Sequence, residues 1–467
     1  FSRYPELQKS IWLELTSARL ILLPLFLFSI FVMDYIIVAY FYMGNDTSFT
    51  EFLYSARKIS MILFIILIFI WGNRLACDSI LNEVNEKTWD FQRMTSISPW
   101  NMAIGKLFGS TISVWYGAMF CIFIYIISSF YLPETGLYLK AGYIMILSGL
   151  LSHALSIGFS LYGIKKSGGT RKINTTFFFL AAMVISFFAV SSFVPIEEDI
   201  MRKGNGIIKW FSFRITEINF LIASLILFLS WALTGLYRNM RSHLQIKNGC
   251  MVWIGFEISL MVYIAGFTAL FDISSYSMQL TRLTICFGIS FLLSYMTLFG
   301  EPKNIVDFRK LSDICAKARW KEIQYHIPLW LISVVTNFVM LISICCLYVL
   351  YIDRSDDGTF GILFLVHLFL FLLRDISLVL YVNMRAGLGR KANKADITAV
   401  FYLLILYILI PSIIKTAHMD YILPALIPDI DVHFGNGLFP VFIQFVFMLC
   451  LLAVQWGKIR LHLNNSI

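Results

Sequence analysis

The chain has 467 residues, of which 59% are hydrophobic, and its mean hydropathy is +0.77. Soluble domains contain about 45–50% apolar residues, so this excess excludes an ordinary soluble protein and indicates helices buried in lipid. The net charge of +9 does not indicate a nucleic-acid partner, because the Lys and Arg residues punctuate the apolar runs instead of forming one basic stripe.

Apolar runs suited to crossing a bilayer recur along the whole chain. A transmembrane helix needs about 20 mostly apolar residues, and the sequence predicts twelve such spans, hence an all-α polytopic membrane protein. The predicted spans lie near 20–42, 60–76, 108–130, 142–164, 177–194, 220–236, 251–271, 281–299, 328–351, 360–382, 397–414 and 438–456.

The basic residues fall mostly on one side of these spans. Of the 37 Lys and Arg residues, 26 lie in or beside the two terminal segments and the even-numbered loops, 10 lie on the opposite side, and Arg374 lies inside a span. Because cytoplasmic loops carry the excess of Lys and Arg, both termini are predicted to be cytoplasmic. The acidic loop with Asp353, Asp356 and Asp357 is then external.

Loop lengths repeat between the two halves of the chain. Long cytoplasmic loops follow the second and eighth spans, at about 77–107 and 300–327, and long external segments follow the fifth and eleventh, at about 195–219 and 415–437. This pattern predicts two parallel six-helix repeats. Both external segments mix apolar residues with Pro and Gly, which favours short helices that dip toward the membrane. The predicted domains are 1–19, an interfacial helix; 20–240, the first six spans; and 241–467, the second six.

The loop after the second span carries the most informative sequence, DSILNEVNEKTWDFQRMTSISPWNMAIGKLFGS over 78–110. It predicts a polar helix, then a break at Pro99-Trp100, and then re-entry into lipid beyond Gly105-Lys106. Such a segment would project a short helix from the membrane toward a soluble partner. On residue patterns alone, an ordinary cytosolic loop is an equal alternative.

This loop resembles the cytoplasmic loop of type-2 ABC transporter permeases, which shows a Glu, a Gly-Thr, one or two prolines and a Gly-Lys. The matching residues are Glu83, Thr88, Pro99, Gly105 and Lys106. Two positions depart from the pattern, with Lys87 in place of the usual Gly and Ser96 in place of a common Pro. The N-terminal segment is similar to the interfacial elbow helix of this family, and residues 231–241 also look like a family feature.

The resemblance implies the membrane subunit of an ABC exporter in the bacterial cytoplasmic membrane. Two fused halves would replace a permease dimer. Separate ABC ATPase subunits, expected in two copies, would bind ATP and Mg at the cytoplasmic face, and a periplasmic accessory subunit is a further candidate partner. The implied ATPase-coupling residues are Glu83, Glu86, Thr88, Trp89, Asp90, Arg93, Pro99, Gly105 and Lys106, with Arg309, Lys317 and Arg319 in the more basic second loop.

The chain is not expected to be an enzyme. It contains no G-x-x-x-x-G-K-[ST] sequence, and Gly105-Lys106 is followed by Leu107 with no Gly five residues before it, so no phosphate cradle is predicted. No cofactor, metal site or catalytic residue is predicted in this chain. The eight cysteines form no CxxC pair and are interpreted as small core residues.

Four charged residues fall inside predicted spans, where charge is costly and side chains usually face the bundle interior. These are Asp34, Glu257, Arg374 and Asp375. Because Arg374 and Asp375 are adjacent and point about 100° apart on a helix, each is predicted to pair with another helix. Interhelical packing is the favoured role, and a substrate path is the alternative. His153 and His367 are predicted to be satisfied buried histidines.

Two other functions are compatible with the sequence. A twelve-span transporter driven by an ion gradient would need no ATPase, and the charges inside the spans are compatible with it. A membrane-embedded enzyme or assembly factor would need convergent polar residues at matched depth, whereas the chain shows scattered ones. The transported substrate is expected to be amphipathic or hydrophobic.

Overall fold

The computed structural model is helical throughout, apart from one two-stranded sheet, in the residues that it describes. Those residues are 5–41, 48–94, 97–131, 135–167, 206–267, 275–303, 305–351, 357–387, 395–429 and 433–464. The chain divides into two compact units. The first comprises Phe1–Ile208 and Arg214–Asn248, and the second comprises Lys209–Phe213 and Gly249–Ile467.

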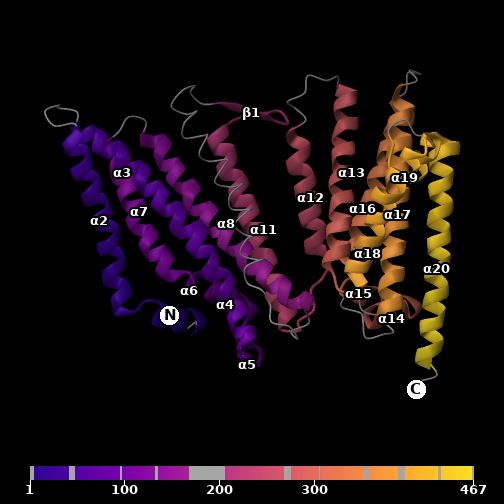
Figure 1. Ribbon diagram of the computed structural model, residues 1–467, viewed down its shortest axis with the longest axis horizontal. Helices are drawn as coiled ribbons and strands as arrows, with labels where there is room; N and C mark the ends of the chain where they lie inside the picture. The colour runs from indigo at the N-terminus through magenta and orange to yellow at the C-terminus, as the bar shows by residue number, and fades with distance from the viewer. Residues whose placement is uncertain are drawn as a thin grey trace. The chain divides into compact units, whose positions relative to one another are not determined.

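The first unit is a bundle of long helices with short helices at one end (Figure 1). Its helices are α1 (Pro5–Glu14), α2 (Ser17–Phe41), α3 (Ser48–Ile65), α4 (Asn73–Asn85), α5 (Trp89–Arg93), α6 (Pro99–Gly109), α7 (Ile112–Tyr131), α8 (Thr135–Ser167) and α11 (Glu217–His243). Helix α2 packs on α3 and α7, α3 packs on α7, and α8 packs on α4 and α11. The apolar core between them includes Phe64, Ile68 and Val114, all fully buried.

The second predicted span, 60–76, is longer in the structure. Helix α3, the π-helical turn η1 (Ile66–Gly72) and α4 form a continuous helical segment, Phe49–Asn85. The prediction followed the apolar run, but helical backbone continues on both sides of it. The polar helix that the sequence predicts at the start of 78–110 is present, and it is continuous with the span: α4 runs through Asn85 and places Glu83 on a helix.

A β-hairpin forms where short helices were predicted. Strands β1 (Ile207–Trp210) and β2 (Phe213–Thr216) pair through a tight turn in which Phe211 has a φ of 50°. The prediction for 195–219 is wrong in this part, because β-branched and aromatic residues flanking a two-residue turn favour a hairpin. Residues 195–205 lie outside the described residues.

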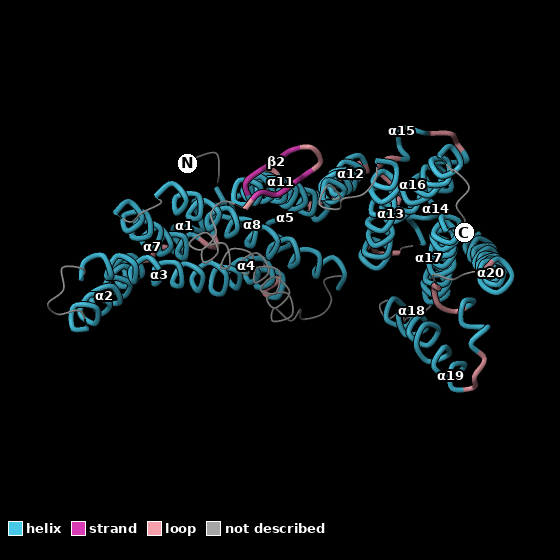
Figure 2. Tube along the Cα trace, turned by 90° about the horizontal axis from the view of Figure 1, so that it is seen from above, coloured by secondary structure: helices cyan, strands magenta, loops and turns pink. Residues whose placement is uncertain are grey.

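The second unit also consists of long helices joined by short ones. Its helices are α12 (Met251–Ala265), α13 (Ser275–Gly300), α14 (Ile305–Ala316), α15 (Trp320–Ile323), α16 (Leu329–Tyr351), α17 (Asp357–Gly387), α18 (Ala395–Leu404), α19 (Ile410–Thr416) and α20 (Phe439–Asn464). Helix α12 packs on α13 and α16, α13 packs on α16, and α17 packs on α20 and α18. Within this unit, α18 and α19 lie on the opposite side of α17 from α16 (Figure 2).

Short helical turns fill the predicted external segment at 415–437, as the sequence predicted. The π-helical turn η4 (Ile405–Leu409) leads into α19, which is followed by the 3-10 helix η5 (Asp420–Ala425). A second π-helical turn, η6 (Phe434–Leu438), precedes α20. Residues 430–432 lie outside the described residues, as do 352–356 of the predicted acidic loop.

Ten helices among the described residues are long and apolar enough to cross a membrane, and Met251–Ala265 is a shorter apolar helix. The predicted span 177–194 lies outside the described residues. Several of these helices present apolar side chains outward: only 11% of the apolar window of Ala395–Thr416 and 17% of that of Phe434–Arg460 is buried. Outward-facing Phe, Ile and Leu along whole helices are suited to lipid. The chain is a multi-span helical membrane protein.

Candidate functional site

The end of α4 determines the shape of the loop singled out in the sequence. The Thr88 N–H donates to the Glu83 carbonyl at 2.9 Å, and the Lys87 N–H donates to the Val84 carbonyl at 3.2 Å. Lys87 has a φ of 62°. This is a Schellman motif, whose left-handed position usually holds Gly. Lys87 adopts this left-handed turn despite its side chain.

Replacing Lys87 with Gly should therefore stabilise the loop. A left-handed backbone costs an ordinary residue about 1 kcal/mol or more, which glycine avoids, so the net gain is about 0.5–1 kcal/mol. Glu86→Gly is the matched control, because Glu86 has a φ of −84° and gains nothing from glycine. Thermal unfolding in detergent should show a higher midpoint for Lys87→Gly and a lower one for Glu86→Gly. Equal shifts would contradict this account.

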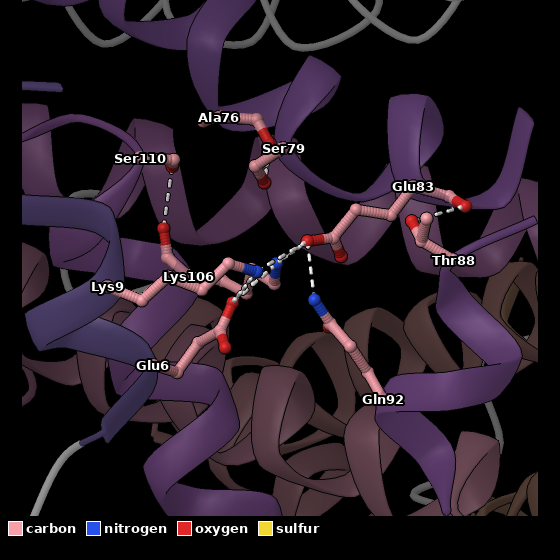
Figure 3. Close-up of polar contacts among 9 residues, drawn as sticks. All are labelled: Glu6, Lys9, Ala76, Ser79, Glu83, Thr88, Gln92, Lys106 and Ser110. Carbon is pink, nitrogen blue, oxygen red and sulfur yellow. Dashed lines mark hydrogen bonds and ion pairs between the residues drawn. The ribbon is translucent and has the colours of Figure 1, made fainter. Parts of the chain in front are cut away.

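Lys106 holds the base of this loop together by joining three separate elements (Figure 3). Its Nζ lies 2.5 Å from Oε1 of Glu83 on α4 and 2.9 Å from Oε1 of Glu6 on α1. The Lys106 side chain is almost fully buried, as is that of Glu6. Gln92 of α5 donates to the same Glu83 oxygen at 2.6 Å. Lys9 stands farther away, 3.8 Å from Glu6 and 3.9 Å from Glu83.

Gly105 allows α1 to approach α6 closely. A Cβ at this position would lie 2.8 Å from the Glu6 Cβ and 3.2 Å from the Leu7 backbone nitrogen. Gly109, one turn later, would similarly meet the Cβ of Ser10 at 2.6 Å. The Gly-Lys pair thus has a structural role in this chain, because Gly105 gives α1 room and Lys106 binds it by charge.

Gly105→Ala should destabilise the first unit by about 1–3 kcal/mol, since neither α1 nor α6 can accept the added methyl without moving. Gly158→Ala in α8 is the matched control: nothing lies within 4 Å of its added Cβ. Alanine there removes a helical glycine and should be neutral or stabilising by up to about 1 kcal/mol. Thermal unfolding that ranks the two variants in the reverse order would refute the close-approach role.

The other predicted coupling residues of this loop are spread around its tip. Glu86, Thr88 and Asp90 are exposed, whereas Trp89 is buried. Pro99 begins α6, where the Ser98 hydroxyl caps the helix by accepting from the Asn101 N–H. The side chain of Arg93 lies outside the described residues.

Two exposed apolar side chains at the tip were not singled out from the sequence. Phe91 is 71% exposed and Met94 is 80% exposed. The turn before α5 and the burial of Trp89 on one side of this short helix leave Phe91 outward. The sequence signal was present, because Trp89 and Phe91 are two residues apart and so lie on opposite sides of a helix, where burial of one exposes the other.

The sequence also missed Glu6, Lys9 and Gln92. Glu6 lies 100 positions from Lys106 in the chain, so no local pattern connects them. One available signal was Lys106 itself, because a cation inside the apolar stretch MAIGKLF requires a counter-charge from elsewhere.

The second unit contains a loop of the same local form. Ala318 has a φ of 50°, the Arg319 N–H donates to the Ile314 carbonyl at 3.1 Å, and a Trp again starts the following short helix. The surroundings differ, because Trp320 is 73% exposed whereas Trp89 is 4% exposed. Of the predicted coupling residues here, Arg319 pairs with Glu322 at 3.2 Å on the surface. Arg309 and Lys317 are also exposed.

Arg374 and Asp375 form an ion pair with each other. The Arg374 Nε and Nη2 lie 3.0 Å and 2.9 Å from Asp375 Oδ1, and both residues are buried. The prediction that these neighbours would not pair is wrong. The guanidinium sits at the end of a long, flexible side chain, so it reaches around the helix to a carboxylate that burial deprives of water.

Partners on other helices complete this cluster, as predicted. Tyr295 and Tyr407 donate to Asp375 Oδ2 at 2.8 Å and 2.7 Å, and Arg374 donates to the Gln444 side-chain oxygen at 3.0 Å. The cluster therefore joins α13, α17, η4 and α20. This arrangement favours the interpretation that these charges hold helices together.

Asp34 and Glu257 bond to hydroxyl groups. Ser55 donates to Asp34 at 2.6 Å, and Ser290 donates to Glu257 at 2.7 Å. Ser333 lies 3.3 Å from the second Glu257 oxygen. Both carboxyls are buried, and each bonds to a neighbouring helix. This placement suits a role in helix packing, and a substrate path is the alternative role.

The two buried histidines differ in their polar neighbours. His153 accepts from the Trp115 indole N–H at 3.2 Å and contacts the Ile68 carbonyl at 3.0 Å, so it is satisfied as predicted. The His367 ring is buried as well, and its polar neighbours are the backbone groups of Pro424 and Asp429. Its ring also packs on Phe371, with the ring centroids 4.7 Å apart.

Comparison with known proteins adds no relative: no family model, curated protein or solved structure matches the chain. Among the described residues, no group of three or more His, Cys, Asp or Glu side chains is arranged to hold a metal ion. The long apolar helices therefore define the class, a multi-span helical membrane protein.

Proposed function

We propose that this chain is the membrane subunit of an ABC exporter in a bacterial cytoplasmic membrane. Separate ATPase subunits, which would carry ATP and Mg, would dock on its cytoplasmic loops and drive export of an amphipathic or hydrophobic substrate. The observation that carries the proposal is the loop around α5. Its apolar tip, Phe91 and Met94, is exposed, while its base is fixed by the buried Lys106 network.

A rigid base and an exposed tip suit the transmission of force. Gln92 of α5 and Lys106 of α6 bind the same Glu83 oxygen on α4. Movement of α5 by a partner would therefore be passed to α4, and thus to the long helical segment Phe49–Asn85. An ordinary surface loop has no need of a buried ion-pair network, which makes that alternative weaker. Exposed apolar side chains close together on a short helix are typical of contact surfaces.

The proposed fusion of two permease halves is supported by their packing. In each unit the first apolar helix contacts the next two long ones (α2 on α3 and α7; α12 on α13 and α16), which also pack on each other. The fourth and last helices pack together, as α8 on α11 and α17 on α20. The Schellman turns at Lys87 and Ala318 fall at equivalent places in this order.

Co-purification tests the proposal. The tagged chain, extracted from its native membrane in mild detergent, should retain an ATP-binding protein at about two copies per chain, as counted by mass spectrometry. The double change Phe91→Ala and Met94→Ala should reduce recovery of that protein about tenfold or more, because interface anchors are each worth about 2 kcal/mol.

Phe213→Ala is the matched control for that experiment. Phe213 is 62% exposed, similar to Phe91, but lies in the hairpin that the predicted topology places on the external side. Its replacement should leave recovery of the ATPase unchanged. If both variants reduce recovery equally, the docking site proposed at α5 is wrong.

A gradient-driven transporter is the second candidate, favoured by the buried carboxyls of Asp34 and Glu257. It predicts that the chain purifies without an ATPase and that proteoliposomes containing it alone conduct proton or sodium flux. Glu257→Gln should then abolish the flux. Proteoliposomes that stay tight without an ATPase would remove this candidate.

A further inference from the structure

A small cleft of about 80 Å³, open to solvent, lies between α14 and the last turns of α20. One wall is formed by Arg309, Ser312 and Asp313, which helical spacing places on one face of α14. The other is formed by Trp456 and Arg460, four residues apart and so on one face of α20. The cleft is outside the Lys106 network and belongs wholly to the second unit.

The charges of the cleft suit a single negative charge. Neither Arg309 nor Arg460 forms an ion pair with another of the described residues, so both guanidinium groups are available. Asp313 contributes one opposing carboxylate. The balance is therefore one net positive charge, which a phosphodiester monoanion neutralises. Guanidinium groups bind phosphate oxygens through paired N–H donors, and the Ser312 hydroxyl adds another donor.

The surface leading to the cleft suits acyl chains. Along α20, Phe447 and Val454 are among the exposed apolar side chains, and they end one turn or less before Trp456. Trp is enriched where a helix leaves the hydrocarbon for the headgroup layer. Basic pockets between helices at this depth are suited to lipid headgroups.

We propose that this cleft binds the phosphate group of a membrane phospholipid, with Arg309 and Arg460 as its ligands and the acyl chains lying along α20. Asp313 limits the affinity by opposing the phosphate charge. The same phosphate chemistry could come from soluble phosphate, and the experiment separates the two sources.

The test is lipid binding to the purified, delipidated full chain in detergent, followed by native mass spectrometry during titration with phosphatidylglycerol. The paired change Arg309→Gln and Arg460→Gln should weaken binding at least about tenfold, because hydrogen bonds to charged groups are worth about 1.5–3 kcal/mol each. The matched control is Lys310→Gln with Lys458→Gln, which removes equal charge from neighbouring exposed positions outside the cleft. The control should change binding less than about twofold.

Asp313→Asn distinguishes loss of the site from misfolding. Removing the opposing charge should strengthen phosphatidylglycerol binding about threefold or more, a gain that a misfolded protein would not show. Inorganic phosphate at millimolar concentration should compete poorly if lipid is the ligand. If phosphate displaces the lipid fully, the source is soluble phosphate and the lipid assignment is wrong. Equal loss in the Arg and Lys pairs, or no gain in Asp313→Asn, would overturn the site itself.

Discussion

Replacing Lys106 with Met should lower the free energy of unfolding of the first unit by about 3 kcal/mol. The change leaves Glu6 and Glu83 close together and largely buried without the cation that both contact, at 2.9 Å and 2.5 Å. Removing one partner of a buried charge network costs more than the network itself contributes, because the remaining charges are left without water. Thermal unfolding of the purified chain in detergent measures the loss.

Lys9→Met is the control for this prediction. Lys9 approaches the same two carboxylates but only at 3.8 Å and 3.9 Å, and its side chain is 52% exposed. Exposed ion pairs contribute about 0–1 kcal/mol, so this variant should unfold nearly as the parent does. Adding Glu83→Gln to Lys106→Met should recover part of the stability. If Lys9→Met were as damaging as Lys106→Met, the central role given to Lys106 would be wrong.

Arg374→Met should destabilise the second unit by about 3–5 kcal/mol. Asp375 is buried and keeps two tyrosine donors, Tyr295 and Tyr407, but loses its cation. The cost arises from an uncompensated carboxylate among apolar helices. Thermal unfolding and the yield of monodisperse protein in detergent should both fall.

The double variant Arg374→Met with Asp375→Asn should recover most of this loss. A neutral amide oxygen still accepts from the two tyrosines, and no unpaired charge is left, as expected when both members of a buried pair are neutralised. A double variant that unfolds as easily as Arg374→Met alone would indicate that the arginine acts through packing on Phe371 and Tyr407, where its guanidinium lies 4.4 Å and 5.1 Å from the ring centroids.

Apolar runs predicted most of the long helices because a spanning segment must be both apolar and about 20 residues long. The limits of the segment Phe49–Asn85 were missed, since its flanks are helical without being apolar and hydropathy gives no signal there. The hairpin at 207–216 was missed because Pro and Gly upstream suggested broken helices, whereas the alternation in IIKW and FRIT is only four residues long.

The loop around α5 shows how far sequence could lead to a site. Glu83, Gly105 and Lys106 were singled out by the resemblance of this loop to a permease pattern, and the structure brings Glu83 and Lys106 into contact. Their partner Glu6 could not be found this way, because the contact depends on how α1 folds back on α6. The pairing of Arg374 with Asp375 was misjudged because backbone geometry fixes Cβ directions but not where a long side chain ends.

The central claim is that α5 contacts an ATPase, and crosslinking from its tip tests this most directly. A photo-reactive amino acid placed at Phe91 in the full chain, in the native cell, should form an adduct with an ATP-binding protein after illumination. The same group at Phe213 should form none. An ATP-binding adduct from Phe91 alone is the result we predict. The contradicting result is the absence of any adduct with an ATP-binding protein from position Phe91, in cells where the chain transports its substrate with a proton or sodium gradient.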